Sequence, residues 1–213
     1  MSDFRYYRPN SFPPLVKNLI IINVLVWVAQ IIFQKNNLTG ILALYPIQHP
    51  YFEPYQIATH MFAHSAVGSG GQIVFFHILF NMFGLYMFGR VLENVWGPKR
   101  FLIFYLACGV GAAVAHLAVQ YLTGNMAAAV GASGAVMGIF AAFAYLFPNT
   151  ELYIMFIPVP IKAKFAVIGL AAIDIFGGVS GGTGVAHFAH LGGALTGFIL
   201  VLIWNKTNRK RFY

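Results

Sequence analysis

Residues 101–122 read FLIFYLACGVGAAVAHLAVQYL, a run of apolar and small side chains without a single Asp, Glu, Lys or Arg. About 20 such residues are enough for an α-helix to cross the hydrocarbon layer of a membrane. Five more apolar segments accompany this one, at residues 16–34, 73–92, 132–147, 163–180 and 185–204. These runs are continuous rather than alternating, which favours helices over the strands of a membrane barrel. The sequence therefore predicts an all-α, polytopic membrane protein with six transmembrane helices.

The composition of the whole chain agrees with this interpretation. Of the 213 residues, 59% are hydrophobic and 8% are charged, whereas soluble domains carry roughly 25% charged residues. So few charged side chains cannot cover a water-soluble surface, and an aromatic content of 16% argues against a disordered chain. The single cysteine, Cys108, excludes a disulfide framework.

The six segments are expected to form one domain over residues 16–205. A polar N-terminal segment at residues 1–15 precedes this domain, and a basic tail at residues 206–213 follows it. The stretch at residues 36–72 mixes aromatic residues, prolines and short apolar patches, so we expect a long, partly helical outer loop.

The net charge of +8 indicates topology. With six spans, twelve of the 13 basic residues fall on one side of the membrane, and only Lys35 falls on the other. Because basic loops stay on the cytoplasmic side, both termini are expected in the cytoplasm. This distribution also makes the lipid bilayer, and not nucleic acid, the expected partner. It carries no information on oligomeric state.

Three of the predicted spans carry polar residues near their outer ends. His77 and Asn81 lie four positions apart in FFHILFNMFG, Ser133 opens the fourth span in AVGASGAVMG, and His187 and His190 begin the sixth. At 1.5 Å per residue, His77, Asn81 and His190 lie roughly 6–13 Å below the starts of their spans. Each residue alone has a simple structural explanation, but three polar sites at one depth indicate a functional pocket.

These residue types indicate acyl-transfer chemistry. A serine hydroxyl becomes a nucleophile when a histidine removes its proton, and donors near it can bind the negative oxygen that forms. The spacing of Gly134 and Gly138 predicts the close helix packing that would bring such groups together. No acidic residue is expected nearby, because Asp174 is assigned to the fifth span and Glu93 to the inner end of the second. We therefore predict a Ser–His dyad and not a triad.

Three motifs together resemble the rhomboid family of intramembrane serine proteases, in its basic six-span bacterial form. They are H-x-x-x-N at 77–81, G-x-S-G at 131–134 and A-H-x-x-G-x-x-x-G at 189–197, and the similarity extends over roughly residues 15–205. The resemblance implies a six-helix rhomboid bundle that cleaves transmembrane segments of other proteins near the outer face of the membrane. It also implies a bacterial inner membrane and no metal or cofactor.

By motif position, the resemblance implies Ser133 as the nucleophile and His190 as the general base. His190 is preferred to His187 because glycines follow it at the third and seventh positions. His77, Asn81 and the backbone N–H of Ser133 would form the oxyanion hole. The glycines that would pack helices near this site are Gly131, Gly134, Gly193 and Gly197. Met137 stands where many relatives have a tyrosine that packs on the catalytic imidazole.

Two other functions remain open at this point. One is a catalytically silent rhomboid-like protein that binds membrane proteins, and the other is a small metal transporter. His60 and His64 have metal-ligand spacing, although we expect them on an interfacial helix with their rings reaching the membrane surface. The glycine-rich outer end of the fifth span is expected to form the lateral gate for substrates.

Overall fold

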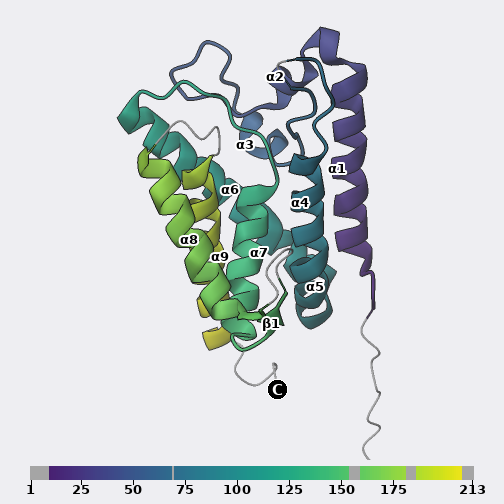
Figure 1. Cartoon of the computed structure of the whole chain (residues 1–213), viewed down its shortest axis with the longest axis vertical. Coiled ribbons are helices and arrows are strands. Elements are labelled where there is room, and N and C mark those ends of the chain that lie inside the picture. The colour runs from purple at the N-terminus through teal and green to yellow at the C-terminus, as the bar shows by residue number, and fades with distance from the viewer. Residues whose placement is uncertain (1–9, 69, 154–158, 181–185, 208–213) are drawn as a thin grey trace, which may run out of the picture.

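The computed structural model describes residues 10–68, 70–153, 159–180 and 186–207. Over these residues, long helices run side by side along one axis, and a folded loop covers one end of the bundle (Figure 1). The helices of the bundle are α1 (Pro14–Ile32), α4 (Phe76–Gly84), α5 (Arg90–Trp96), α6 (Pro98–Thr123), α7 (Ser133–Leu146), α8 (Ala163–Ser180) and α9 (His187–Thr207). A single π-helical turn, η2 (Leu85–Gly89), joins α4 to α5, so these two form one interrupted helix.

Shorter elements occupy the connections. The turn η1 (Gln34–Asn36) and the helices α2 (Leu38–Leu42) and α3 (Gln56–Thr59) belong to the loop between α1 and α4. The strands β1 (Glu151–Leu152) and β2 (Ile161–Lys162) pair antiparallel between α7 and α8, with Glu151 opposite Lys162. The expected outer loop is therefore partly helical, as the mixed composition of residues 36–72 predicted.

The prediction of an all-α polytopic membrane protein is confirmed. Among the described residues, α1, α6, α8 and α9 are long and apolar enough to cross a membrane. The helix α7 is apolar but has only 14 residues. Large apolar side chains point outward from the bundle, and Leu122, Phe176 and Val179 are 76–81% exposed. Such a surface is costly in water and suits contact with lipid tails.

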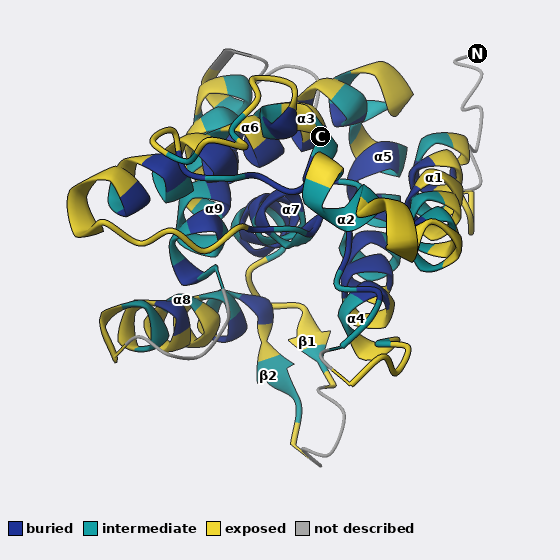
Figure 2. Cartoon of the chain, turned by 90° about the horizontal axis from the view of Figure 1, so that it is seen from above, coloured by how far each residue is buried: buried dark blue, intermediate teal, exposed yellow. Residues whose placement is uncertain are grey.

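The helix α7 is central to the bundle, and Figure 2 shows it surrounded by the other long helices. Most of its residues are buried because its neighbours shield it on several sides. It begins below the upper ends of α6 and α8 (Figure 1). Helix α9 packs against it through glycines, and a Cβ on Gly197 would overlap the backbone of Gly138.

Two buried polar side chains fix α1 to the rest of the fold. Glu93 lies 3% exposed on α5 and accepts hydrogen bonds from the N–H groups of Leu15 and Val16, at 3.0 and 2.7 Å. It thereby satisfies two of the backbone donors that the first turn of a helix leaves unpaired. Near the other end of α1, the Gln30 side chain donates to the carbonyl of His64 and accepts from its N–H, at 2.8 and 2.9 Å.

The expectation that the rings of His60 and His64 reach the membrane surface was wrong. Both residues are buried, with exposed fractions of 5% and 0%. The His64 ring is hydrogen-bonded to Asn23 of α1 at 2.9 Å, and His60 Nδ1 donates to the carbonyl of Gln56 at 2.9 Å. The loop folds over the end of the bundle, and its backbone and ring hydrogen bonds hold these histidines inside.

Candidate active site

Ser133 is the first residue of α7, and the segment before it determines its position. Ala129 exchanges backbone hydrogen bonds of 2.9 Å with Leu44, and the N–H of Gly131 donates to the carbonyl of His60 at 2.9 Å. Gly131 has φ of 131°, a conformation that side chains other than glycine rarely adopt. This turn brings Ser133 into the bundle at the N-terminus of a helix, where the backbone N–H groups have no carbonyl partner within their own helix.

The hydroxyl of Ser133 meets the imidazole of His190. The Oγ atom lies 2.8 Å from His190 Nε2, across the contact between α7 and α9. The two helices approach closely here because Gly193 faces Gly134, and a Cβ at Gly193 would overlap the carbonyl oxygen of Gly134. The predicted pairing of these two motifs is thus a property of the glycine contact that holds their helices together.

A third group, from α8, completes this arrangement. Asp174 Oδ1 lies 2.9 Å from His190 Nδ1 and 2.7 Å from His187 Nδ1, and Asp174 is 6% exposed. The expectation that no acidic residue lies near the site was therefore wrong. His190 contacts a carboxylate through one ring nitrogen and a serine hydroxyl through the other, which is the arrangement of a Ser–His–Asp triad.

The sequence did contain a signal for Asp174. Helix α8 runs in the direction opposite to α7 and α9, so its outer end is its C-terminus at Ser180. Asp174 precedes that end by six residues, or about 9 Å of helix. This depth falls within the roughly 6–13 Å at which the other polar residues were expected. Measuring depth from the C-terminal end of the fifth span would have included Asp174 in the site.

His77 and Asn81 lie on α4, one turn apart. The N–H of Ser65 donates to His77 Nδ1 at 3.0 Å, so a neutral His77 carries its proton on Nε2. That nitrogen lies 3.1 Å from the point where a Cβ on Gly131 would stand, beside the turn that leads to Ser133. The amide of Asn81 donates one hydrogen bond to the carbonyl of His77 at 2.7 Å. A second N–H of the same amide is not used by this bond.

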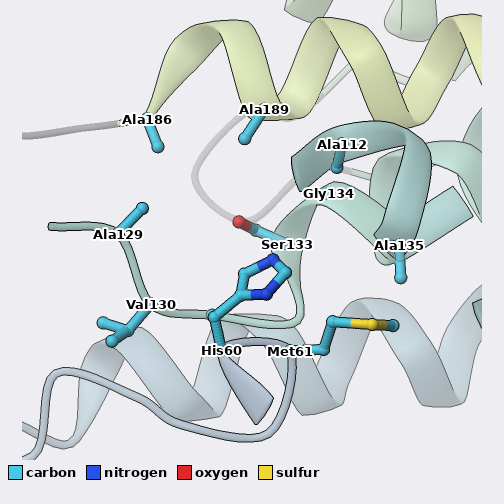
Figure 3. A pocket seen from close by; sticks show the side chains of 12 residues that line it. His60, Met61, Ala112, Ala129, Val130, Ser133, Gly134, Ala135, Ala186 and Ala189 are labelled. Atoms are coloured by element: carbon cyan, nitrogen blue, oxygen red, sulfur yellow. The ribbon is translucent and has the colours of Figure 1, made fainter. Parts of the chain in front are cut away.

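A small pocket adjoins Ser133. Figure 3 shows His60 and Met61 on one side of the serine and Ala186 and Ala189 on the other. Most of the side chains that line it are small, and the full lining is His60, Met61, Gly109, Ala112, Ala129, Val130, Gly131, Ser133, Gly134, Ala135, Ala186 and Ala189. These walls leave room for little more than a water-sized group beside the hydroxyl of Ser133.

Two histidines of the outer loop, His60 and His64, have lowered pKa values and are neutral near pH 7. Burial, with a smaller contribution from nearby His77, lowers the pKa of His64 to about 3. Burial also lowers the pKa of His60, and its backbone hydrogen bonds offset this only in part. Protonation of His64 would place a second N–H at Nδ1, a buried atom for which the described residues provide no hydrogen-bond partner.

One group of side chains within the described ranges has the composition of a metal site. One ligand atom from each of Asp174, His187 and His190 lies within 4.8 Å of the others. A carboxylate and two imidazoles are ligands that zinc accepts. The two hydrogen bonds to Asp174 Oδ1 also account for the short distances within this group.

Fold and site together define a polytopic α-helical membrane protein with a Ser–His pair beneath one end of its helices. The chain belongs to the rhomboid family, because residues 51–206 match the family model described as the Rhomboid domain. This family acts on membrane-protein substrates within the bilayer, and its members are generally intramembrane serine proteases.

Curated relatives support this assignment. The chain is 35% identical over 136 residues to Presenilin-associated rhomboid-like protein A, mitochondrial, of Danio rerio, which covers 61% of this chain and 36% of that protein. It is 33% identical over 198 residues to Rhomboid-like protein 11, chloroplastic, of Arabidopsis thaliana, covering 88% and 64%. With RHOMBOID-like protein 12, mitochondrial, of the same plant, identity is 31% over 172 residues, covering 74% and 48%. The chain thus spans between 36% and 64% of the length of these relatives.

The comparisons contradict the expected bacterial inner membrane. The relatives are named as mitochondrial or chloroplastic proteins, which points to the membrane of an organelle. The integral membrane character of the chain agrees with this correction. The distribution of basic residues indicates only which ends of the helices share a side, and it does not identify the membrane.

Proposed function

We propose that this chain is an intramembrane serine endopeptidase in which Ser133 is the nucleophile and His190 the general base. The observation that carries the proposal is the distance of 2.8 Å between Ser133 Oγ and His190 Nε2 at the N-terminus of α7. We assign the activity to the domain at residues 16–205. Its substrates would be transmembrane segments of other proteins, cleaved near the end of the bundle that the outer loop covers.

In the first half of the reaction, His190 Nε2 takes the proton of Ser133 as Oγ bonds to the carbonyl carbon of the scissile peptide. The carbonyl oxygen becomes an oxyanion. When the C–N bond breaks, the imidazolium of His190 gives its proton to the leaving amine, and an acyl-enzyme remains. In the second half, His190 removes a proton from water, the hydroxide attacks the acyl carbon, and the proton returns to Ser133 as the acid product leaves.

Three donors are available for the oxyanion. The backbone N–H of Ser133 is at a helix N-terminus, whose partial positive charge favours an anion. His77 offers Nε2–H, because its Nδ1 already accepts from Ser65. Asn81 offers the N–H that does not donate to the carbonyl of His77. Together they support a developing negative charge without a metal ion.

The surroundings of Ser133 also favour a class of substrate. The pocket beside the hydroxyl is lined mostly by small residues, so we expect a small residue at the cleavage site. A helical substrate has its carbonyls already hydrogen-bonded, so it must unwind locally to reach Ser133. We propose that it enters beside α8, which Figure 2 shows at the edge of the bundle.

Labelling with a fluorophosphonate tests the proposal without knowledge of the natural substrate, because this probe reacts with activated serines. The wild-type protein in detergent should be labelled, and Ser133→Ala and His190→Ala should not. Ser11→Ala is the matched control, since Ser11 is exposed before α1. His187→Ala should retain substantial labelling. Labelling of Ser133→Ala at the wild-type rate, or loss in His187→Ala but not in His190→Ala, would refute the assigned roles.

Cleavage of co-reconstituted single-span proteins with alanine and glycine near one membrane face completes the test. Ser133-dependent cleavage would exclude the silent binding protein. A chelator separates the protease from the metal-dependent alternative, which the group of Asp174, His187 and His190 keeps open. Activity unchanged in EDTA supports the serine mechanism, and activity lost in EDTA and restored by zinc contradicts it.

A further inference from the structure

Asp174 is a buried carboxylate on α8, an apolar helix at the edge of the bundle (Figure 2). Most large side chains of α8 point away from the bundle, and Phe165, Ile168, Ile173 and Phe176 are each more than half exposed. Asp174 points the other way and is 6% exposed. An acidic side chain in a membrane-spanning helix is costly, and such residues normally face partners inside the bundle. The partners of Asp174 are the two histidines in the first turn of α9.

The contact with His190 fixes the tautomer that catalysis needs. A neutral imidazole has one N–H donor and one acceptor nitrogen. With Nδ1–H donated to the carboxylate at 2.9 Å, Nε2 is the acceptor that faces the Ser133 hydroxyl at 2.8 Å. The same carboxylate stabilises the positive imidazolium that forms when Ser133 attacks. Without it, the ring can carry its proton on Nε2, where it cannot serve as a base.

The contact with His187 holds the carboxylate itself. His187 Nδ1 lies 2.7 Å from the same oxygen, Oδ1, that meets His190. Two donors on one oxygen define the rotation of the carboxylate and offset the cost of burying it. Helix α8 can approach closely enough for this contact because Gly177 faces His187, and a Cβ at Gly177 would overlap the ring.

We propose that Asp174 is a positioning residue that completes an Asp174–His190–Ser133 unit, with His187 holding its carboxylate. This inference rests on the proposed function of Ser133 and His190. The activity then also depends on the packing of α8 against α9, because α8 supplies the carboxylate. Movement of α8 away from α9 would separate Asp174 from His190 and leave the base without its orienting partner.

The test is the steady-state kinetics of Asp174→Asn on a single-span substrate that the wild type cleaves. The same replacement in a soluble triad protease lowers kcat about 10⁴-fold. We expect a smaller fall of about 10–1,000-fold, because α9 packing also constrains the ring. KM should change less than threefold, since Asp174 is behind His190 and away from the substrate pocket, and Asp174→Glu should recover part of the lost kcat.

A structural control is Glu93→Gln, which removes a buried carboxylate that caps α1 and does not touch the site. It should lower the melting temperature and leave kcat of the folded enzyme unchanged. Asp174→Asn with wild-type kcat, in an enzyme that still needs Ser133, overturns the positioning role alone. The positioning role is also overturned if Asp174→Asn loses activity only because it unfolds, with normal kcat per folded molecule. A wild type without Ser133-dependent labelling refutes instead the proposed function.

Discussion

Gly138→Ala tests whether the spacing between α7 and α9 controls the chemistry. A Cβ at Gly138 would lie 2.8 Å from the carbonyl oxygen of Gly193 and 2.5 Å from Cys108 Sγ, whereas ordinary contact begins at 3.4 Å. The helices must therefore separate by roughly 0.6 Å at this level. Transmitted to the site, this shift would stretch the 2.8 Å distance between Ser133 and His190 to about 3.4 Å, near the limit of a hydrogen bond.

We expect this substitution to lower kcat about 10–100-fold, because a misplacement of about 1 Å can cost roughly 10²-fold in rate. Overpacking should also lower the free energy of unfolding by about 1–3 kcal/mol. The assays are the rate of fluorophosphonate labelling, kcat on a single-span substrate and thermal unfolding in detergent. Together they separate a misaligned site from a protein that has not folded.

Gly169→Ala is the matched control. Gly169 is also a helical glycine, but a Cβ there would meet nothing within 4 Å. The Gly169→Ala variant should keep its activity, and its free energy of unfolding should stay constant or rise by about 0.5–1 kcal/mol. If Gly138→Ala keeps wild-type activity and melting temperature, the reasoning from close helix packing to site geometry is refuted.

Three further predictions concern the oxyanion hole, the outer loop and substrate entry. Asn81→Ala should lower kcat roughly 3–100-fold, and the loss should stay limited because two other donors to the oxyanion remain. Unchanged kcat in both this variant and His77→Ala would exclude these two side chains as oxyanion donors. Since the pKa of His64 is lowered to about 3, the unfolded chain binds a proton below about pH 6.5 that the folded protein does not. The free energy of unfolding should therefore fall by about 2 kcal/mol between pH 8 and pH 5, and thermal unfolding of His64→Gln should show a smaller pH dependence. A disulfide that ties the outer ends of α8 and α4 should block cleavage of a transmembrane substrate and leave labelling by the small fluorophosphonate intact, whereas unchanged cleavage would reject α8 as the gate.

The helices of this protein could be predicted from local composition. Each of the six expected apolar segments overlaps a helix, and α8 has the expected bounds of residues 163–180. Hydropathy is a property of neighbouring residues, so it can be evaluated without knowledge of the fold. The three motifs likewise selected Ser133 and His190, which the structure brings to 2.8 Å.

Contacts between distant segments could not be predicted in the same way. Glu93 was assigned to the inner end of the second span, but its role as the cap of α1 depends on residues 77 and 78 positions away. The burial of His60 and His64 depends on how the outer loop folds back over α1. Contacts of this kind depend on how whole helices pack, and local residue patterns carry little information about that packing.

The position of Asp174 depends partly on local sequence and partly on helix packing. The sequence determined its depth, because the direction of a helix and a rise of 1.5 Å per residue follow from the order of the spans. It did not determine which face of α8 meets α9, or that two histidines would share one carboxylate oxygen. Only the tertiary structure decided that, because a helix can rotate about its axis without changing its hydropathy, and the rotation is set by contacts such as Gly177 against His187.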